Sequence, residues 1–160
     1  MSYKKYLICF FYLTIYPIMQ IPLSVGDFLD KYSILTIKAK KILDIEKQKN
    51  IFNELLLLKE RYQEIITVPG VQELYEVLTC INQELWNIES EKRICEKQGI
   101  EKIILKIKNH ETLLQDESHL LITFLSLARQ VYIQNDQRAR IKKAINIISD
   151  SEIVEEKSHF

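Results

Sequence analysis

The fold is decided most clearly by residues 121–148, with the sequence LITFLSLARQVYIQNDQRARIKKAINII. An α-helix turns about 100° per residue, so residues three, four and seven positions apart share one face. On this count an apolar stripe runs from Phe124 to Val131. The same face then continues with four polar residues, Asn135, Arg138, Lys142 and Asn146. A surface helix normally carries such residues on its opposite side, so this segment predicts amides and cations turned toward the core.

A second segment, residues 71–97, repeats this pattern. Leu74, Leu78 and Leu85 form its apolar face, and Asn82, Glu89, Arg93 and Glu96 fall on the same face. If the two helices pack face to face, these polar groups meet inside the bundle, where facing helices usually build ligand sites. The predicted ligand-binding residues are therefore Asn82, Glu89, Arg93, Asn135, Arg138, Lys142 and Asn146.

Each buried charge in this centre needs a partner, because an unpaired buried charge is costly. Glu89 is expected to pair with Arg138 or Lys142, and Arg93 with Glu96. Three interpretations stay open. In the first, the centre is an internal network or a homodimer interface, which specifies how the helices pack. In the second, the remaining cations bind a phosphate or carboxylate, as in an anionic sugar-linked metabolite, because arginine offers forked donors for such anions. In the third, the centre is a catalytic site.

Composition predicts a single helical domain. A chain of 160 residues is the size of one domain, and its three glycines and three prolines leave few corners between long helices. The 22 basic and 22 acidic residues cancel, so no overall field draws the chain to nucleic acid. Cys9, Cys80 and Cys95 have no metal-ligand spacing and are read as reduced thiols, with Cys95 buried. A cytoplasmic protein is expected.

Residues 1–18, MSYKKYLICFFYLTIYPI, differ from the remainder of the chain. Two lysines precede an apolar run that is shorter than the roughly 20 residues of a membrane-spanning helix. Three interpretations stay open: a misplaced start with the natural chain beginning at Met19, a membrane anchor or signal, and a packed strand or helix. Membrane contact is expected only if this segment is a real anchor. The single helical domain is assigned to residues 19–160.

Capping and turn signals divide that domain. Ser24 followed by Asp27 marks a helix start, and Lys31 then lies in the apolar stripe of that helix, either snorkelling to water or turned toward the polar centre. Residues 46–67 are strongly helical, with coiled-coil-like apolar spacing that Leu56 and Leu57 widen. The Val68-Pro69-Gly70 turn predicts an antiparallel hairpin between that helix and the next.

The later boundaries are less sharply marked. Residues 100–109 can form a short helix, and Asn135-Asp136 could interrupt the last one, because both residues favour caps and turns. The tail from residue 149 is polar. The prediction is an all-α bundle of four or five helices built from antiparallel hairpins, with a polar C-terminal tail.

Motifs for specific chemistry are weak, and whether the protein is an enzyme stays open. Glu73 and Glu76 give one half of the paired motif of helical nucleotide pyrophosphohydrolases, but no E-x-x-D follows, so no metal site is predicted. The composition permits a chorismate-mutase-like bundle without a detailed match. His110, His119 and His159 lie in polar segments with no sign of a triad. No cofactor and no nucleic-acid partner are expected, since the basic residues near Arg140 share their face with Asp136.

Four segments, IPLSVGDFLDKYSILTIK, INQELWNIE, LARQVYIQNDQRARIKKAIN and VEEKSH, occur in this order. Together they resemble an uncharacterised bacterial all-helical family, a domain of unknown function associated with glycosyltransferases and surface-polysaccharide synthesis genes. The resemblance covers residues 19–159 and is most specific at Asn135 to Ala139 and Glu155 to Ser158. It departs at residues 100–119, which look longer, and at His159, where a tyrosine would be expected. The resemblance implies an accessory role in surface-glycan synthesis and implies no reaction.

Overall fold

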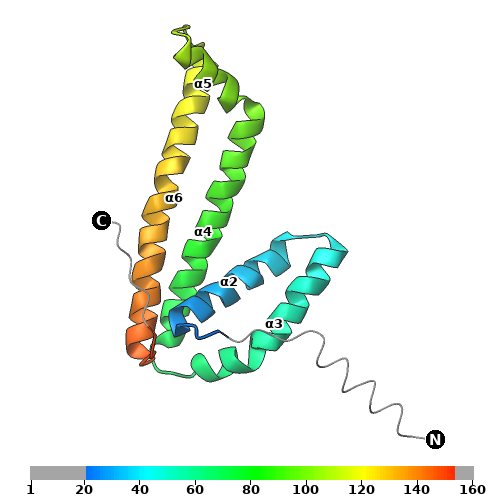
Figure 1. The fold of residues 1–160 in the computed structure, drawn as a ribbon, viewed down its shortest axis with the longest axis vertical. Helices are drawn as coiled ribbons and strands as arrows, with labels where there is room; N and C mark the ends of the chain where they lie inside the picture. Colours follow the sequence, from blue (N-terminus) through cyan, green and yellow to red (C-terminus); the bar gives the residue numbers. More distant parts are fainter. Residues whose placement is uncertain (1–20, 154–160) are drawn as a thin grey trace, which may run out of the picture.

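A computed structural model describes residues 21–153, which form five α-helices and no strand (Figure 1). The helices are α2 (Val25–Lys41), α3 (Ile45–Ile65), α4 (Val71–Gln98), α5 (Ile100–Lys108) and α6 (Gln115–Ile148). The predicted all-α bundle is thereby confirmed. The predictions for residues 1–18 and for the end of the tail lie outside the described residues. Within residues 21–153, no helix combines the length and apolar character that crossing a membrane requires.

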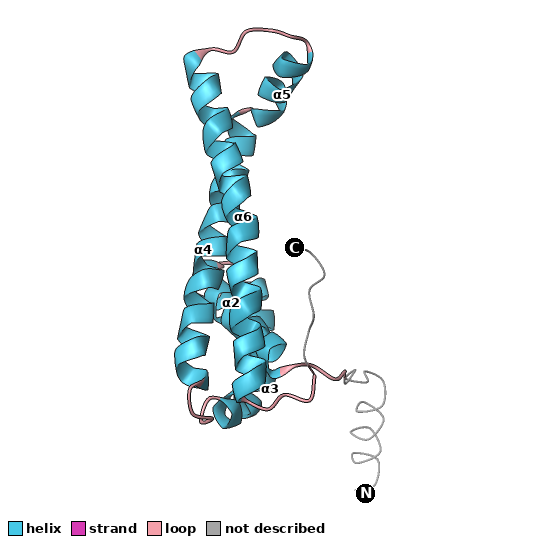
Figure 2. Ribbon diagram, turned by 90° about the vertical axis from the view of Figure 1, so that its left-hand side faces the viewer, coloured by secondary structure: helices cyan, strands magenta, loops and turns pink. Residues whose placement is uncertain are grey.

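The antiparallel pair α4 and α6 is the longest structure in the molecule and the axis of the fold (Figure 1). Figure 2 shows the two helices side by side along most of their length. Helix α6 runs unbroken for 34 residues, so Asn135-Asp136 does not interrupt it. The reason is local: Asn135 Nδ2 donates to the carbonyl of Val131 at 2.9 Å, one turn earlier. The amide side chain is thus satisfied within the helix and does not compete with its backbone.

Helix α2 lies between the α4–α6 pair and α3, and forms a hairpin with α3 (Figure 1). Ser24 caps α2 by accepting from the Asp27 amide at 3.1 Å, which confirms the predicted helix start. Asp44 caps α3 in the same way, accepting from the Lys47 amide at 2.9 Å. Both caps satisfy amides that the first helical turn leaves without a partner.

The predicted hairpin between α3 and α4 is wrong in its packing, although Val68-Pro69-Gly70 does form the turn. Helix α3 packs along α2 instead and diverges from α4 beyond the turn (Figure 1). The predicted apolar face of α3 is narrower than expected, because Leu56 and Leu57 are 70% and 72% exposed. Lys31 points away from the polar centre and pairs with Glu54 of α3 at 2.8 Å.

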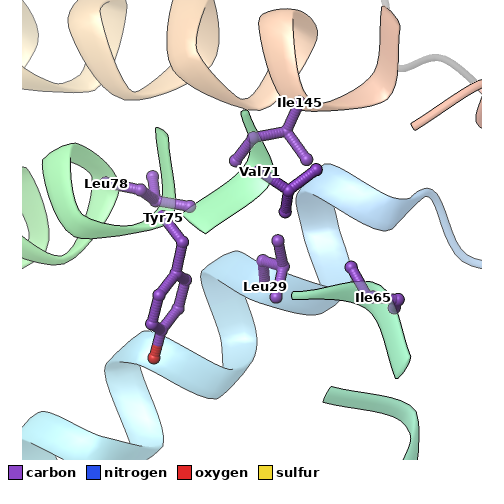
Figure 3. Close-up of a cluster of buried hydrophobic side chains, with 6 residues drawn as sticks. All are labelled: Leu29, Ile65, Val71, Tyr75, Leu78 and Ile145. Atoms are coloured by element: carbon purple, nitrogen blue, oxygen red, sulfur yellow. The ribbon is translucent and has the colours of Figure 1, made fainter. Parts of the chain in front are cut away.

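The main core lies where α2, α3, α4 and α6 meet, and it is drawn in Figure 3. Its buried members are Leu29, Ile65, Val71, Tyr75, Leu78 and Ile145. Aromatic rings extend this core between α2 and α3, with the Tyr32 and Tyr62 rings stacked at a centroid distance of 4.1 Å. Tyr75 packs edge-on against Tyr62 at 5.3 Å, and burial raises the pKa of Tyr75 to about 12. Burial thus disfavours the charged form of the Tyr75 hydroxyl.

A second core lies at the far end of the α4–α6 pair, where α5 closes the structure (Figure 2). Cys95 is buried there, as predicted, together with Ile88, Ile100, Ile103 and Leu127. Gly99 ends α4 with a φ of 113°, a left-handed conformation that favours glycine. Lys106 of α5 pairs with Glu117 of α6 at 2.6 Å, and its hydrogen bond holds the pKa of Glu117 below the usual value.

Candidate functional site

The polar centre of the molecule is a forked ion pair between Asp30 of α2 and Arg138 of α6. Arg138 Nε donates to Asp30 Oδ1 at 2.8 Å, and Arg138 Nη2 donates to Asp30 Oδ2 at 2.5 Å. The side chains of Arg138 and Asp30 are 28% and 8% exposed, so water screens the pair only in part. Two parallel bonds between a guanidinium and a carboxylate are stronger and more directional than a single contact. This pair therefore fixes both the distance and the orientation between α2 and α6.

Amides and a hydroxyl complete the polar centre. Asn82 of α4 donates through Nδ2 to Asp30 Oδ1 at 2.9 Å and to Ser33 Oγ at 2.6 Å. Ser33 in turn donates to the backbone carbonyl of Asp30 at 2.8 Å, and Arg138 Nη1 donates to Asn135 Oδ1 at 3.2 Å. Since Asn82 and Ser33 are almost fully buried, these bonds offset the cost of removing their polar groups from water. Three helices are thus joined around one carboxylate.

A second set of contacts fastens the first turn of α2 to the end of α6. Lys142 Nζ pairs with Asp27 Oδ1 at 2.5 Å, and Ser24 Oγ donates to Asp27 Oδ2 at 2.6 Å. The Gly26 amide donates to Asn146 Oδ1 at 2.6 Å. These contacts supply acceptors and charge to a helix N-terminus, where amides lack partners and the helix dipole favours a carboxylate.

Gly26 permits this close approach of α2 to α6. A Cβ atom placed on Gly26 would lie 2.5 Å from the backbone carbonyl oxygen of Lys142 and 2.9 Å from Asn146 Oδ1. Both distances are shorter than a carbon atom tolerates, and a backbone carbonyl cannot rotate out of the way. The absence of a side chain at this position therefore sets how tightly the two helices dock.

Five of the seven predicted site residues join these contacts. Arg138, Asn135 and Asn82 lie in the polar centre, while Lys142 and Asn146 hold the start of α2. The predicted pairing partners were wrong. Glu89 pairs with Lys92 of its own helix at 3.2 Å. Arg138 and Lys142 pair instead with carboxylates of α2. Within residues 21–153 no Arg93–Glu96 ion pair forms, and the Arg93 side chain lies at the surface.

The α2 side of the centre was not predicted from the sequence. Gly26, Asp30, Ser33 and Ile37 follow a spacing of four, three and four residues, which places them on one helical face. That face lies against α4 and α6, while Phe28, Tyr32 and Leu35 belong to the other side of the helix. A helix buried on two sides shows two stripes, and the aromatic one was the more conspicuous. The repeated small or polar residues were the signal that could have found Asp30.

A groove opens beside the polar centre, between α2 and α4. Its volume is about 420 Å³, and four apolar side chains, Ile34, Ile37, Leu85 and Trp86, form much of its wall. Asn82 and Arg138 reach it from the polar centre, and Glu89, Ser90 and Arg93 line it along α4. Four of the seven predicted ligand-binding residues therefore border one groove: Asn82, Glu89, Arg93 and Arg138.

The polar centre is suited to holding helices together and is poorly suited to acid–base catalysis. The Asp30 carboxylate accepts three hydrogen bonds from Asn82 and Arg138, so both of its oxygens are engaged by side chains of the centre. In the described part of the chain, no three histidine, cysteine, aspartate or glutamate side chains gather as a metal site would require. His110 and His119 are exposed, and the prediction for His159 lies outside the described residues.

Comparisons of the chain with protein-family models, with curated proteins and with solved structures found no match. The functional interpretation therefore depends on the contacts, charges and exposed surfaces of this chain. The resemblance to the bacterial helical family stays a prediction.

Proposed function

We propose that this protein is an interaction protein that forms a homodimer through the exposed α3 stripe, which comprises Ile45, Phe52 and Leu56. These three side chains are 80%, 54% and 70% exposed. Their spacing of seven and four residues places them on one face of α3, separate from the face that packs on α2. Apolar residues at this spacing are typical of a helix that packs against another helix.

The burial of α3 supports this proposal. Of its 21 residues only Ile51 and Ile65 are buried, and its main contacts are with α2. The second apolar stripe of this edge helix is exposed to water. Association would bury it, with a favourable free energy of roughly 25 cal/mol per Å² of apolar area. The exposed α3 stripe is therefore the main support for the homodimer.

A second copy of the chain is the occupant that fits this stripe. In a two-fold dimer each subunit contributes the same patch, so one apolar stripe covers the other. The 22 basic and 22 acidic residues leave no net charge to drive two copies apart. The polar centre supports a role in interaction as well, because Asp30 and Arg138 engage one another and so favour rigidity over catalysis.

Light scattering coupled to size-exclusion chromatography tests the dimer. We expect the wild-type chain to elute with twice its mass of 19.0 kDa, and the Phe52→Glu/Leu56→Glu double variant to elute as a monomer with unchanged helical content. Leu105→Glu is the matched control, since Leu105 is an exposed apolar residue of α5, outside the stripe. A wild-type chain that stays monomeric at its highest soluble concentration would contradict the proposal.

The cellular setting that we propose is bacterial surface-glycan synthesis, in the cytoplasm, and its support is the resemblance of the IPLSVGDFLDK and NDQRA segments. In this setting the dimer would act as an accessory protein to glycan-building enzymes. Deleting the gene from its bacterial host should reduce or alter the surface polysaccharide, and restoring it should reverse the change. Unaltered polysaccharide in the deletion strain would contradict the setting and leave the dimer proposal intact.

A further inference from the structure

We infer that the groove between α2 and α4 binds a nucleoside diphosphate or a ligand built on one. The groove volume of about 420 Å³ falls within the usual range of small-molecule pockets. Its lining residues come mainly from α2 and α4, and Figure 1 shows these two helices diverging from the end of the molecule where they pack together. This inference goes beyond the homodimer, because the groove and the exposed α3 stripe share no residue.

The groove offers a planar ligand an apolar wall. Ile34 and Ile37 of α2 face Leu85 and Trp86 of α4 across it, and the indole of Trp86 is only partly buried. A partly exposed indole beside aliphatic side chains provides a flat surface for an aromatic ring, and stacking of a base on such a ring is worth about 1–3 kcal/mol. A nucleobase would fit against this wall.

The charges around the groove favour an anion. Arg138 is neutralised by Asp30 and Glu89 by Lys92, at 2.5 and 3.2 Å. Arg93 has no ion-pair partner among residues 21–153, so its charge is the one left uncompensated at the groove. A guanidinium offers forked donors that match phosphate oxygens. Phosphate groups are therefore expected at Arg93.

The order of residues along α4 matches the order of groups in a nucleotide. Trp86, Glu89 and Arg93 line the same groove at successive turns, and Trp86 and Arg93 are separated by about 10 Å along the helix axis. A ribose joins a base to its phosphates over a comparable span. Glu89 lies between the two ends, and its carboxylate can accept hydrogen bonds from ribose hydroxyls. Because Lys92 pairs with Glu89, it reduces the repulsion between the Glu89 carboxylate and the phosphates.

Trp86 provides the measurement, because it is the single tryptophan of the chain. Titration of the full-length protein with uridine diphosphate or adenosine diphosphate should change the tryptophan fluorescence saturably. Uridine alone and inorganic pyrophosphate alone should each bind at least about tenfold more weakly, because each lacks one of the two anchoring groups. Equal binding of pyrophosphate and the diphosphates would overturn the inference in favour of a simple anion site.

Two variants make the test specific. Arg93→Ala should weaken diphosphate binding about tenfold or more, the loss expected for a hydrogen bond to a charged group, without lowering the melting temperature. Arg140→Ala, which removes an exposed arginine of α6 outside the groove, should bind as the wild type does. No saturable fluorescence change with any diphosphate, or unchanged binding by Arg93→Ala, would overturn the inference. The Phe52→Glu/Leu56→Glu variant should retain the affinity, whatever its oligomeric state.

Discussion

Replacing Arg138 by alanine is expected to lower the free energy of unfolding by about 3 kcal/mol or more, because it leaves the Asp30 carboxylate buried without its cation. Asp30 is 6% exposed, so its carboxylate has little contact with water that could compensate for the lost guanidinium. Asn82 and Ser33 would keep hydrogen bonds in the centre, but neither carries a positive charge. Urea denaturation followed by circular dichroism measures the loss.

Two substitutions serve as controls for Arg138→Ala. Arg138→Lys keeps the positive charge and loses the fork, so its stability should fall between those of the wild type and the alanine variant. Arg140→Ala removes an exposed arginine of the same helix and should change stability by less than about 0.5 kcal/mol. An Arg138→Ala protein as stable as Arg140→Ala would show that the Asp30–Arg138 pair does not hold α2 against α6.

Replacing Gly26 by alanine is expected to destabilise the protein by about 2 kcal/mol or more, because the new methyl group would meet the Lys142 carbonyl oxygen at 2.5 Å. Relief of that contact requires α2 to move away from α6, which also stretches the Gly26–Asn146 hydrogen bond. Helix propensity acts in the opposite direction, since alanine is favoured over glycine in a helix by up to about 1 kcal/mol. A loss of stability therefore isolates the effect of the close approach.

Thermal and urea denaturation of Gly26→Ala measure this effect. Asn146→Ala provides a comparison, because it removes the side chain near Gly26 but leaves the Lys142 carbonyl oxygen in place. The Gly26→Ala/Asn146→Ala double variant should therefore recover little of the stability. A Gly26→Ala protein equal to or more stable than the wild type would contradict the described docking of α2 on α6.

Much of the fold follows from local signals. Ser24 predicted the start of α2, and the Val68-Pro69-Gly70 turn predicted the corner before α4; each is found where local chemistry places it. The partner of α3 could not be predicted in this way. A turn fixes where a chain changes direction, but the packing of the next helix depends on which apolar surfaces compete for it. Here the Tyr32 ring of α2 stacks on Tyr62 of α3, and α2 takes the place expected for α4.

The sequence predicted only part of the candidate site. Periodicity indicated that Asn82 and Arg138 turn inward, because a polar residue in an apolar stripe is visible in the sequence alone. Their common partner, Asp30, lies 108 residues before Arg138 in the chain, and no local pattern connects the two. Glu89 was the expected partner since it lies on α4, the helix that faces α6. Asp30 becomes the nearer carboxylate only because α2 packs against both α4 and α6.

The Asp30–Arg138 pair is expected to couple α2 to α6. A double-mutant cycle with Asp30→Asn, Arg138→Met and the combined variant measures that coupling directly, from the urea denaturation of the four proteins. We predict a coupling energy of about 2 kcal/mol. The double variant should therefore lose less free energy of unfolding than the sum of the losses in the two single variants. A coupling energy below about 0.5 kcal/mol would contradict the account, because the two groups would then act independently.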